Sequence, residues 1–371
     1  MPELVFAIAM LLAFVNGAND NIKATATLYG AGVLTRWRAI TLATFATGVG
    51  SLASIAIATT LVRAFSGKGL IPDAALTPAL LAAVGAGAAL TVLLATRLGF
   101  PVSTTHALVG GLLGAGWVAA GRALDLAALG GAFALPLLLG PLLAVGLALL
   151  LLRGGQRLSS RLGVGEDTCV CVGEPLAPLA ATPDGHLVAH AAGGAPAWPP
   201  LEIAPRAECA IHSPGRRARL DVHTALGASH LFSACLVGFA RGLNDTPKIL
   251  GLVVGAAVVS PASGALAIAA AMALGGLLAS RRVSETLAHK ITPMTESQGL
   301  AGNVTTSLLV IGASRFGVPV STTHVATGGI FGIGLSGGEL RWRTAGEVLL
   351  AWFTTLPLAA LLAALFAWGM L

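Results

Sequence analysis

The sequence predicts an all-α integral membrane protein built of two inverted-topology repeats, with broken helices, re-entrant hairpins and about 10–12 membrane segments. Three observations lead to this fold class. Of the 371 residues, 55% are hydrophobic and only 10% are charged, whereas a soluble protein carries roughly 25% charged residues. The apolar residues form long runs, and two polar motifs each occur twice.

Ten apolar runs are long enough to enter a bilayer. They are 3–33, 39–62, 74–98, 100–120 and 126–152, followed by 224–257, 262–280, 298–314, 317–336 and 344–370. Five runs therefore form a first membrane repeat, 1–152, and five form a second, 224–371. An odd number of passes in the first repeat reverses the orientation of the second in the membrane.

Between the repeats lies 153–223, with 8 of the chain's 19 prolines, seven Lys or Arg residues and seven Asp or Glu residues. This composition predicts a poorly ordered linker outside the membrane. Its cysteines and histidines are Cys169, Cys171, Cys209, His186, His190, His212 and His223. They include no Cys-x-x-Cys pair and are irregularly spaced, so a zinc site is not expected.

Basic residues lie mostly in the short polar gaps between apolar runs, which is typical of anchors on the cytoplasmic side. They include Arg36, Arg38, Arg281, Arg282, Arg341 and Arg343. This distribution predicts a multi-pass protein of the plasma (inner) membrane, with a cytoplasmic linker and both termini outside. The anchors account for the formal charge of +6, so nucleic-acid binding is not indicated. No basic segment precedes the first apolar run, so a cleaved signal peptide is not expected.

The duplicated motifs are polar. Gly99–Gly116 and Gly317–Gly334 agree at eleven of eighteen positions, including an unbroken Pro-Val-Ser-Thr-Thr-His. Upstream of them, Gly-Ala-Asn-Asp-Asn-Ile-Lys begins at Gly17 and Gly-Leu-Asn-Asp-Thr-Pro-Lys begins at Gly242. The two motifs follow in the same order in both repeats, which indicates that the repeats are homologous.

The upstream motif places ionisable side chains inside apolar runs. With the adjacent amides, these residues are Asn19, Asp20 and Lys23 in one repeat and Asn244, Asp245 and Lys248 in the other. An ionisable group in hydrocarbon costs at least about 2.5 kcal/mol, so the set indicates a functional site. We expect a helix to break at Asn19-Asp20, because irregular backbone at that depth must line a cavity or be buried in protein. The pseudo-twofold axis of the repeats would bring both sets together near the midplane.

The Pro-Val-Ser-Thr-Thr-His motif predicts the start of a helix in each repeat. Pro is tolerated in a first turn, Ser and Thr are good caps, and first-turn N–H groups have no intrahelical partner. Half-helices that begin near Ser103 and Ser321 would direct N–H groups, hydroxyls and the positive end of the helix dipole at one place. Such an arrangement binds an anion such as phosphate or sulfate. His106 and His324 would either shape the hairpins or contact the substrate.

These paired motifs resemble those of the inorganic phosphate transporter (PiT) family. The resemblance covers both membrane repeats and fails only over 153–223. It implies a secondary transporter (a symporter) and not an enzyme. Such a transporter carries phosphate together with sodium or protons and uses no cofactor. It also implies a substrate and sodium site formed by Asn19, Asp20, Asn244 and Asp245, and a phosphate cradle formed by Ser103, Thr104, Thr105, Ser321, Thr322 and Thr323.

Lys23 and Lys248 depart from the family pattern, which has Asn at this position. An Asn carbonyl suits a sodium ion, whereas a Lys ammonium repels one. Our hypothesis is that each ammonium takes the place of a coupling sodium ion, where it neutralises Asp20 or Asp245 or reaches the phosphate. Coupling would then be to protons or to fewer sodium ions. In the alternative, both lysines extend to the membrane surface or pair structurally with acids.

Other functions stay open at this point. Ionised Asp20 and Asp245 favour phosphate, which has a proton to donate, over sulfate, which has none; a sulfate or other oxyanion transporter of the same fold is the alternative. An anion channel is less favoured, because rings of Lys or Arg are expected in its pore. A membrane sensor that uses the linker as its output is a further reading. The sequence does not determine the oligomeric state, and a homo-oligomer is possible. It contains no phosphate-binding loop motif, which argues against transport driven by ATP.

Overall fold

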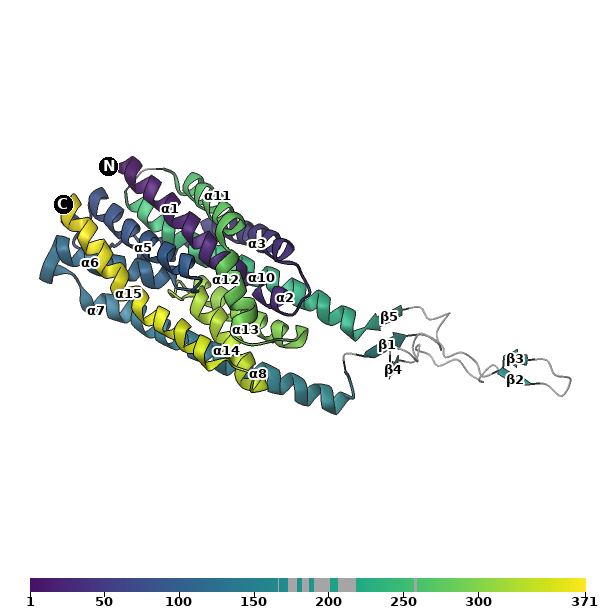
Figure 1. The fold of residues 1–371 in the computed structure, drawn as a ribbon. Helices are drawn as coiled ribbons and strands as arrows, with labels where there is room; N and C mark the ends of the chain where they lie inside the picture. Colours follow the sequence, from purple (N-terminus) through teal and green to yellow (C-terminus); the bar gives the residue numbers. More distant parts are fainter. Residues whose placement is uncertain (166, 173–178, 182–186, 190–200, 206–217, 257–258) are drawn as a thin grey trace. The chain divides into compact units, whose positions relative to one another are not determined.

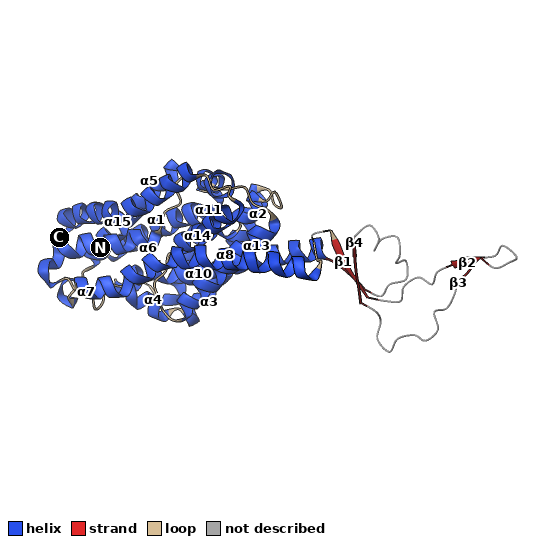
Figure 2. Ribbon diagram, turned by 90° about the horizontal axis from the view of Figure 1, so that it is seen from below, coloured by secondary structure: helices blue, strands red, loops and turns tan. Residues whose placement is uncertain are grey.

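The computed structural model describes residues 1–165, 167–172, 179–181, 187–189, 201–205, 218–256 and 259–371 (Figure 1). These residues form two compact units. The first comprises Met1–Arg153 and His230–Leu371, and the second comprises Gly154–Ser229. In the first unit the described elements are helices, and the two chain termini lie at the same end of the helical bundle (Figures 1 and 2).

The helices of the first half of the chain follow the predicted apolar runs. Their bounds are α1 (Pro2–Asp20), α2 (Ala26–Gly30), α3 (Arg36–Ile57), α4 (Thr59–Ala64), α5 (Pro78–Leu98), α6 (Thr104–Ala120), α7 (Leu126–Leu129) and α8 (Leu135–Leu162). Short 3-10 turns cover Asn21–Ala24, Asp73–Ala75 and Gly121–Ala123, and a π-helical turn, Gly130–Ala134, joins α7 to α8.

The helices of the second half cover the remaining predicted apolar runs. Their bounds are α10 (Val222–Gly255), α11 (Pro261–Ala279), α12 (Arg281–Glu285), α13 (Glu296–Arg315), α14 (Thr322–Gly337) and α15 (Trp342–Met370). A π-helical turn, Thr286–Lys290, follows α12.

Within the described residues, seven helical stretches are long and apolar enough to cross a membrane. They are Pro2–Ala24, Arg36–Ile57, Pro78–Leu98, Leu126–Leu162, Val222–Gly255, Pro261–Ala279 and Trp342–Met370. This confirms an all-α, multi-pass membrane protein. Of the other predicted runs, α6 and α14 have only 17 and 16 residues, fewer than the roughly 20 that a span needs. The third, α13, buries polar side chains such as Asn303 and Thr306.

The predicted break in the first run is confirmed. Helix α1 ends at Asp20, and a 3-10 turn and the short α2 follow within the same apolar run. The second half differs, because α10 continues through Asn244 and Asp245 with Pro247 inside the helix. Proline lacks an N–H group and so removes one helical hydrogen bond at this point, but the helix does not break.

Helices α6 and α14 begin where the duplicated motif predicts. Ser103 caps α6 by accepting a hydrogen bond from the backbone N–H of His106 at 3.1 Å. Ser321 caps α14 by accepting one from the N–H of His324 at 3.2 Å. The side chains of these serines therefore satisfy one first-turn donor in each helix.

Close helix contacts join the first half of the chain to the second. A Cβ atom on Gly17 of α1 would meet the backbone carbonyl of Met272 on α11, and one on Gly242 of α10 would meet that of Thr47 on α3. Glycine is needed at these positions because the neighbouring backbone lies where a side chain would be. The first helix of each half thus packs on a helix of the other half, α1 on α11 and α10 on α3.

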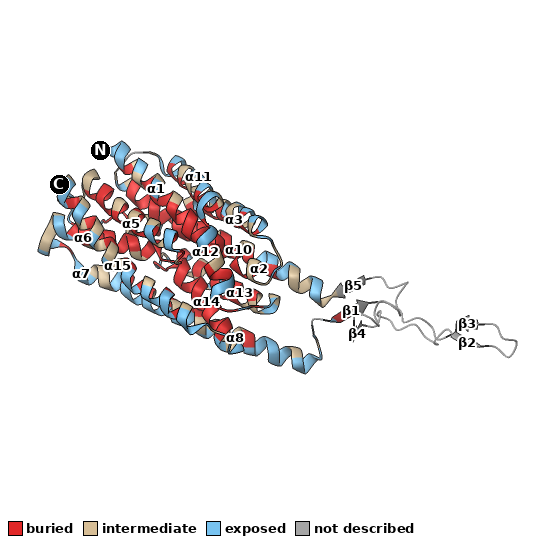
Figure 3. Ribbon diagram, in the orientation of Figure 1, coloured by how far each residue is buried: buried red, intermediate tan, exposed pale blue. Residues whose placement is uncertain are grey.

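The last helix of each half likewise packs on helices of the other half. Helix α15 packs on α5 and α6, with Gly114 of α6 against the carbonyl of Ala360, while α8 packs on α14, with Gly332 against Val145 and Ala148. Buried residues gather in the middle of the bundle, and the outer faces of α8 and α15 are exposed (Figure 3). The polar motifs lie within this buried middle.

The second unit contains the described strands, coloured red in Figure 2. Strand β1 (Thr168–Val172) pairs in antiparallel fashion with β4 (Leu201–Pro205) and β5 (Ala218–Asp221), and β2 (Leu179–Ala181) pairs with β3 (Leu187–Ala189). Helix α8 continues to Leu162, beyond the predicted end of the first repeat at 152. The boundaries and cytoplasmic location of the linker stay a prediction.

Candidate functional site

The duplicated motifs converge in the buried middle of the first unit. Among the described residues, five Asp, Glu, Lys or Arg side chains are buried, and each is at most 4% exposed. They are Asp20, Lys23, Arg241, Asp245 and Lys248. Four of them were predicted as site residues, and their burial excludes the alternative in which the lysines extend to the membrane surface.

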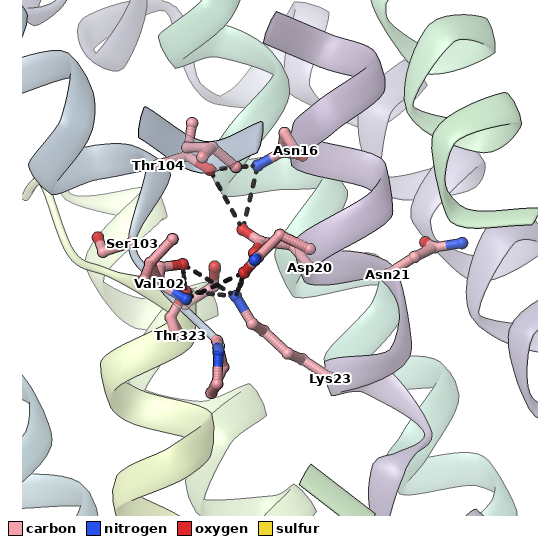
Figure 4. Close-up of polar contacts among 12 residues, drawn as sticks. Asn16, Asp20, Asn21, Lys23, Val102, Ser103, Thr104 and Thr323 are labelled. Atoms are coloured by element: carbon pink, nitrogen blue, oxygen red, sulfur yellow. Dashed lines mark hydrogen bonds and ion pairs between the residues drawn. The ribbon is translucent and has the colours of Figure 1, made fainter. Parts of the chain in front are cut away.

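Asp20 is the centre of the cluster in the first repeat (Figure 4). One carboxylate oxygen pairs with the ammonium group of Lys23, which also donates hydrogen bonds to the hydroxyl of Thr323 and, at 3.3 Å, to the carbonyl of Val102. The other carboxylate oxygen accepts a hydrogen bond from the Asn16 amide at 3.1 Å and lies 3.5 Å from the Thr104 hydroxyl. Three elements, α1, α6 and α14, therefore meet around the Asp20–Lys23 ion pair.

Asn19 fixes the loop that leads into α6. Its amide donates to the Thr96 hydroxyl and to the Phe100 carbonyl, both at 2.9 Å, and its carbonyl oxygen accepts from the Val102 N–H at 3.0 Å. The side chain replaces the backbone hydrogen bonds that this irregular segment lacks. Asn19 thereby positions the start of α6 against the end of α1.

Asp245 is the centre of the second cluster. Its carboxylate lies 3.5 Å from the Lys248 ammonium and accepts a hydrogen bond from Thr322 at 3.3 Å. Lys248 donates to the Thr105 hydroxyl at 2.7 Å and to the Val320 carbonyl at 2.6 Å. The amide of Asn244 holds the same segment through the Val320 carbonyl at 3.2 Å.

The two clusters have the same plan. Each lysine contacts the aspartate of its own repeat, the valine carbonyl before the helix cap of its own repeat, and the second threonine of the other repeat. Each second threonine also donates to the valine carbonyl of the opposite repeat, Thr323 to Val102 at 2.7 Å and Thr105 to Val320 at 3.2 Å. The structure therefore brings all twelve predicted side chains to one region, with Ser103 and Ser321 there as caps.

Sequence analysis missed two residues of this region, Asn16 and Arg241. They occupy the same position in the two repeats, three residues before the Asn-Asp pair. The Arg241 guanidinium donates to Asn16 Oδ1 at 2.6 Å and to Asn21 Oδ1 at 2.9 Å, and its Nε lies 3.6 Å from Asp245. An arginine inside an apolar run is itself a functional signal, so Arg241 could have been identified by the rule that identified Asp245.

The oxygens expected to bind sodium are occupied by donors from the protein. Lys23 holds Asp20, Lys248 lies next to Asp245, and the side-chain carbonyl of Asn244 accepts from Ser314 at 3.3 Å. An ammonium competes with a cation for the same oxygen, so these contacts do not favour sodium there. The sodium site stays a prediction.

The rings of the two histidines of the motif contact each other in a tilted arrangement. The ring centroids of His106 and His324 are 4.3 Å apart, and the Trp352 ring lies 4.0 Å from that of His324. Trp352 donates to the carbonyl of Pro101 at 3.1 Å, next to the predicted cradle. The imidazoles therefore join α6, α14 and α15 by ring contact.

No group of three or more His, Cys, Asp or Glu side chains with metal-binding geometry occurs in the described part of the chain. Of the linker residues considered for zinc, His186, His190, Cys209 and His212 lie outside that part.

The arrangement has the chemistry of an oxyanion site. Two helix N-termini bring first-turn N–H groups and threonine hydroxyls to one buried region, and three cationic side chains surround it. Helix N-termini and Lys or Arg donors each favour a bound anion. Two carboxylates in the same region can accept a proton from a ligand that still carries one.

Comparisons with known proteins agree with this chemistry. A sequence profile described as the phosphate transporter family matches residues 16–363. A Mycobacterium bovis protein described as "probable low-affinity inorganic phosphate transporter" is 28% identical over 379 aligned positions, which cover 99% of this chain and 76% of that protein. A Rhizobium meliloti protein of the same description is 27% identical, over 98% of this chain and 95% of its own length.

A solved structure has the same fold. It is described as a sodium-dependent phosphate transporter and superposes with a TM-score of 0.74 at 21% sequence identity, covering 99% of this chain and 98% of its own. An Arabidopsis thaliana protein described as a chloroplastic inorganic phosphate transporter is 26% identical, over 96% of this chain and 70% of that protein. The relatives are thus transporters and not enzymes.

Proposed function

Because the chain belongs to the phosphate transporter family, we propose that it is a cation-coupled secondary transporter that carries inorganic phosphate across a membrane by alternating access. The observation that carries the proposal is the pair of capped helix N-termini, α6 and α14, which meet at one buried site. Each presents two threonines, and a lysine from the other half of the chain contacts one of them.

Inverted repeats supply the route for alternating access. In transporters of this kind, a site between two inverted halves is exposed to one side and then the other when the halves exchange conformations. The exchanged packing supports such a relation here, since α1 packs on α11 and α10 packs on α3. The lysine bonds between repeats would break and re-form during that exchange.

The proposed ligand site comprises the residues of both motifs. They are Asn19, Asp20, Lys23, Ser103, Thr104, Thr105, Asn244, Asp245, Lys248, Ser321, Thr322 and Thr323. We assign the threonine hydroxyls and helix N-termini to phosphate binding, and the aspartates to the acceptance of the phosphate proton. That last role would favour phosphate over sulfate.

The lysines bear on the coupling ion. The related structure is described as sodium-dependent. Here the ammonium groups of Lys23 and Lys248 lie beside the carboxylates of Asp20 and Asp245, where a sodium ion would have to bind. We therefore propose coupling to protons, or to fewer sodium ions than two equivalent aspartate sites could hold. The protein would lie in the plasma (inner) membrane with the linker cytoplasmic and both termini outside; the termini lie at one end of the bundle, which accords with this (Figure 1).

The test is uptake of radiolabelled phosphate by the purified protein in proteoliposomes, with sodium and proton gradients imposed in turn. We expect saturable uptake. Thr104→Val removes a hydroxyl beside Asp20 and should raise the KM for phosphate about tenfold or more. Thr91→Val is the matched control, because the buried Thr91 hydroxyl only donates to the Gly87 carbonyl of its own helix. Sulfate that competes as well as phosphate would contradict the selectivity, and non-saturable flux would indicate a channel.

A further inference from the structure

The buried charges of the site do not cancel. Within the described residues, the buried ionised groups are two carboxylates, Asp20 and Asp245, and three cations, Lys23, Lys248 and Arg241. Lys23 pairs with Asp20 and Lys248 lies beside Asp245, so each repeat is balanced by its own lysine. Arg241 lies 3.6 Å from the same Asp245 carboxylate, so with Arg241 the cluster has one more cation than it has carboxylates.

Arg241 is held mainly by neutral groups. Its two terminal nitrogens donate to the side-chain oxygens of Asn16, Asn21 and Thr47, at 2.6, 2.9 and 3.2 Å. Its Nε has no hydrogen-bond partner although it is buried, and it lies 3.6 Å from a carboxylate oxygen of Asp245 that Thr322 also contacts. The guanidinium therefore retains an unused donor at the site.

Arg241 makes the two otherwise equivalent clusters of the site unequal. At the position of Arg241, the first repeat has the neutral Asn16, whose amide bridges Asp20 and Thr104. Arg241 instead reaches across to that asparagine, so the two equivalent residues contact each other. Through its two hydrogen bonds, the Asn16 amide links the guanidinium to Thr104 in the first turn of α6.

A buried charge without a counter-ion is unfavourable, so a site with one surplus cation favours a ligand that carries one negative charge. A dianion would reverse the imbalance, and a bound sodium ion would increase the surplus. We propose that Arg241 sets the net charge of the site so that it takes a singly charged oxyanion, dihydrogen phosphate, without a sodium ion. This inference rests on the proposed function and adds the ionic form of the substrate and the residue that selects it.

Two further titratable side chains face this region from α6 and α14, His106 and His324. Their rings contact each other with centroids 4.3 Å apart, and two imidazolium groups in such contact would repel. Neutral imidazoles leave the charge balance as counted above. Lys23 and Asp20 from α1 and its following turn, with Lys248 and Asp245 from α10, complete the charged groups that face Arg241 among the residues described.

Two opposite changes test the inference in proteoliposomes, with initial uptake rates measured without sodium and with an inward sodium gradient. Arg241→Gln removes the surplus charge, and Asn21→Asp adds a carboxylate 2.9 Å from the guanidinium and cancels it while providing a new ion pair. We expect sodium-independent uptake by the unmodified protein, and at least about a tenfold rise in KM for phosphate in both variants. Arg241→Lys, which keeps the charge, should recover most of the affinity.

Asn21→Asp separates charge from structure, since a merely structural arginine would tolerate or benefit from the added partner. The Asn21 amide otherwise donates to the Thr44 hydroxyl, which can itself donate to a carboxylate at that position. The control is Arg315→Gln, an exposed arginine at the end of α13, with unchanged KM expected. An unchanged KM in Asn21→Asp, or uptake by the unmodified protein that requires sodium, overturns this inference alone. Absence of phosphate uptake by the unmodified protein under any gradient overturns the proposed function, and this inference with it.

Discussion

The ammonium group of Lys23 donates a hydrogen bond to the hydroxyl of Thr323, which lies 300 positions further along the chain. Lys248 makes the equivalent bond to Thr105 in the opposite direction, at 2.7 Å. Because both bonds cross between the repeats, a relative movement of the repeats changes both together. The two lysines therefore tie the helix starts of one half of the chain to the motif of the other half.

We expect Thr323→Val and Thr105→Val to have nearly the same effect. Each removes the hydroxyl partner of a buried ammonium, which costs about 1–3 kcal/mol at the affected donor. KM for phosphate should rise by a similar factor in both variants, and Thr→Ser at either position should restore it. If one variant is inactive and the other has normal KM, the two halves do not contribute equally.

Asp20→Asn should lower both stability and uptake. The change leaves the buried Lys23 ammonium without its counter-ion, and breaking such a pair typically costs about 3–5 kcal/mol. The double change Asp20→Asn with Lys23→Gln should recover the unfolding temperature in detergent but not phosphate uptake. Recovery of uptake in the double variant would mean that the pair has only a structural role.

Gly114→Ala should destabilise the protein by about 1–3 kcal/mol, because the new methyl group would meet the backbone carbonyl of Ala360 on α15. Gly146→Ala in α8 is the control, since no heavy atom lies within 4 Å of its Cβ position. Alanine favours a helix over glycine, so this control should be neutral or slightly stabilising. Thermal unfolding in detergent gives both values, and equal shifts would contradict the packing.

Trp352→Phe should raise KM for phosphate while keeping an aromatic ring against His324. The variant loses the 3.1 Å hydrogen bond to the Pro101 carbonyl, which holds the loop before α6 and is worth about 1 kcal/mol. Trp342→Phe, at an exposed position, is the matched control and should leave KM unchanged. Equal KM values in the two variants would mean that the loop is held without Trp352.

The starts of α6 and α14 could be predicted because a cap depends on local chemistry. Ser103 and Ser321 are followed by residues that continue a helix, and the cap bonds span only three residues. The break after Asp20 was predictable for a related reason, since polar residues at membrane depth need partners that a straight helix does not offer.

Contacts between distant segments could not be predicted in the same way. The bonds of Lys23 to Thr323 and of Arg241 to Asn16 depend on the packing of helices that are far apart in the sequence. The motif alone also does not predict that α10 continues through Asp245, whereas α1 ends at Asp20. A membrane helix tolerates Pro247 where neighbouring groups satisfy the freed carbonyl.

The packing of α6 against α15 has a consequence for synthesis. Helix α6 ends at Ala120. The face of α6 that carries Gly110 and Gly114 is covered by α15, which begins only at Trp342. At ribosomal rates of about 5–20 residues per second, this interval lasts roughly 10–45 s. During that time the short, glycine-rich helix has no protein partner on that face, so lipid or the insertion machinery must shield it until the final helix emerges.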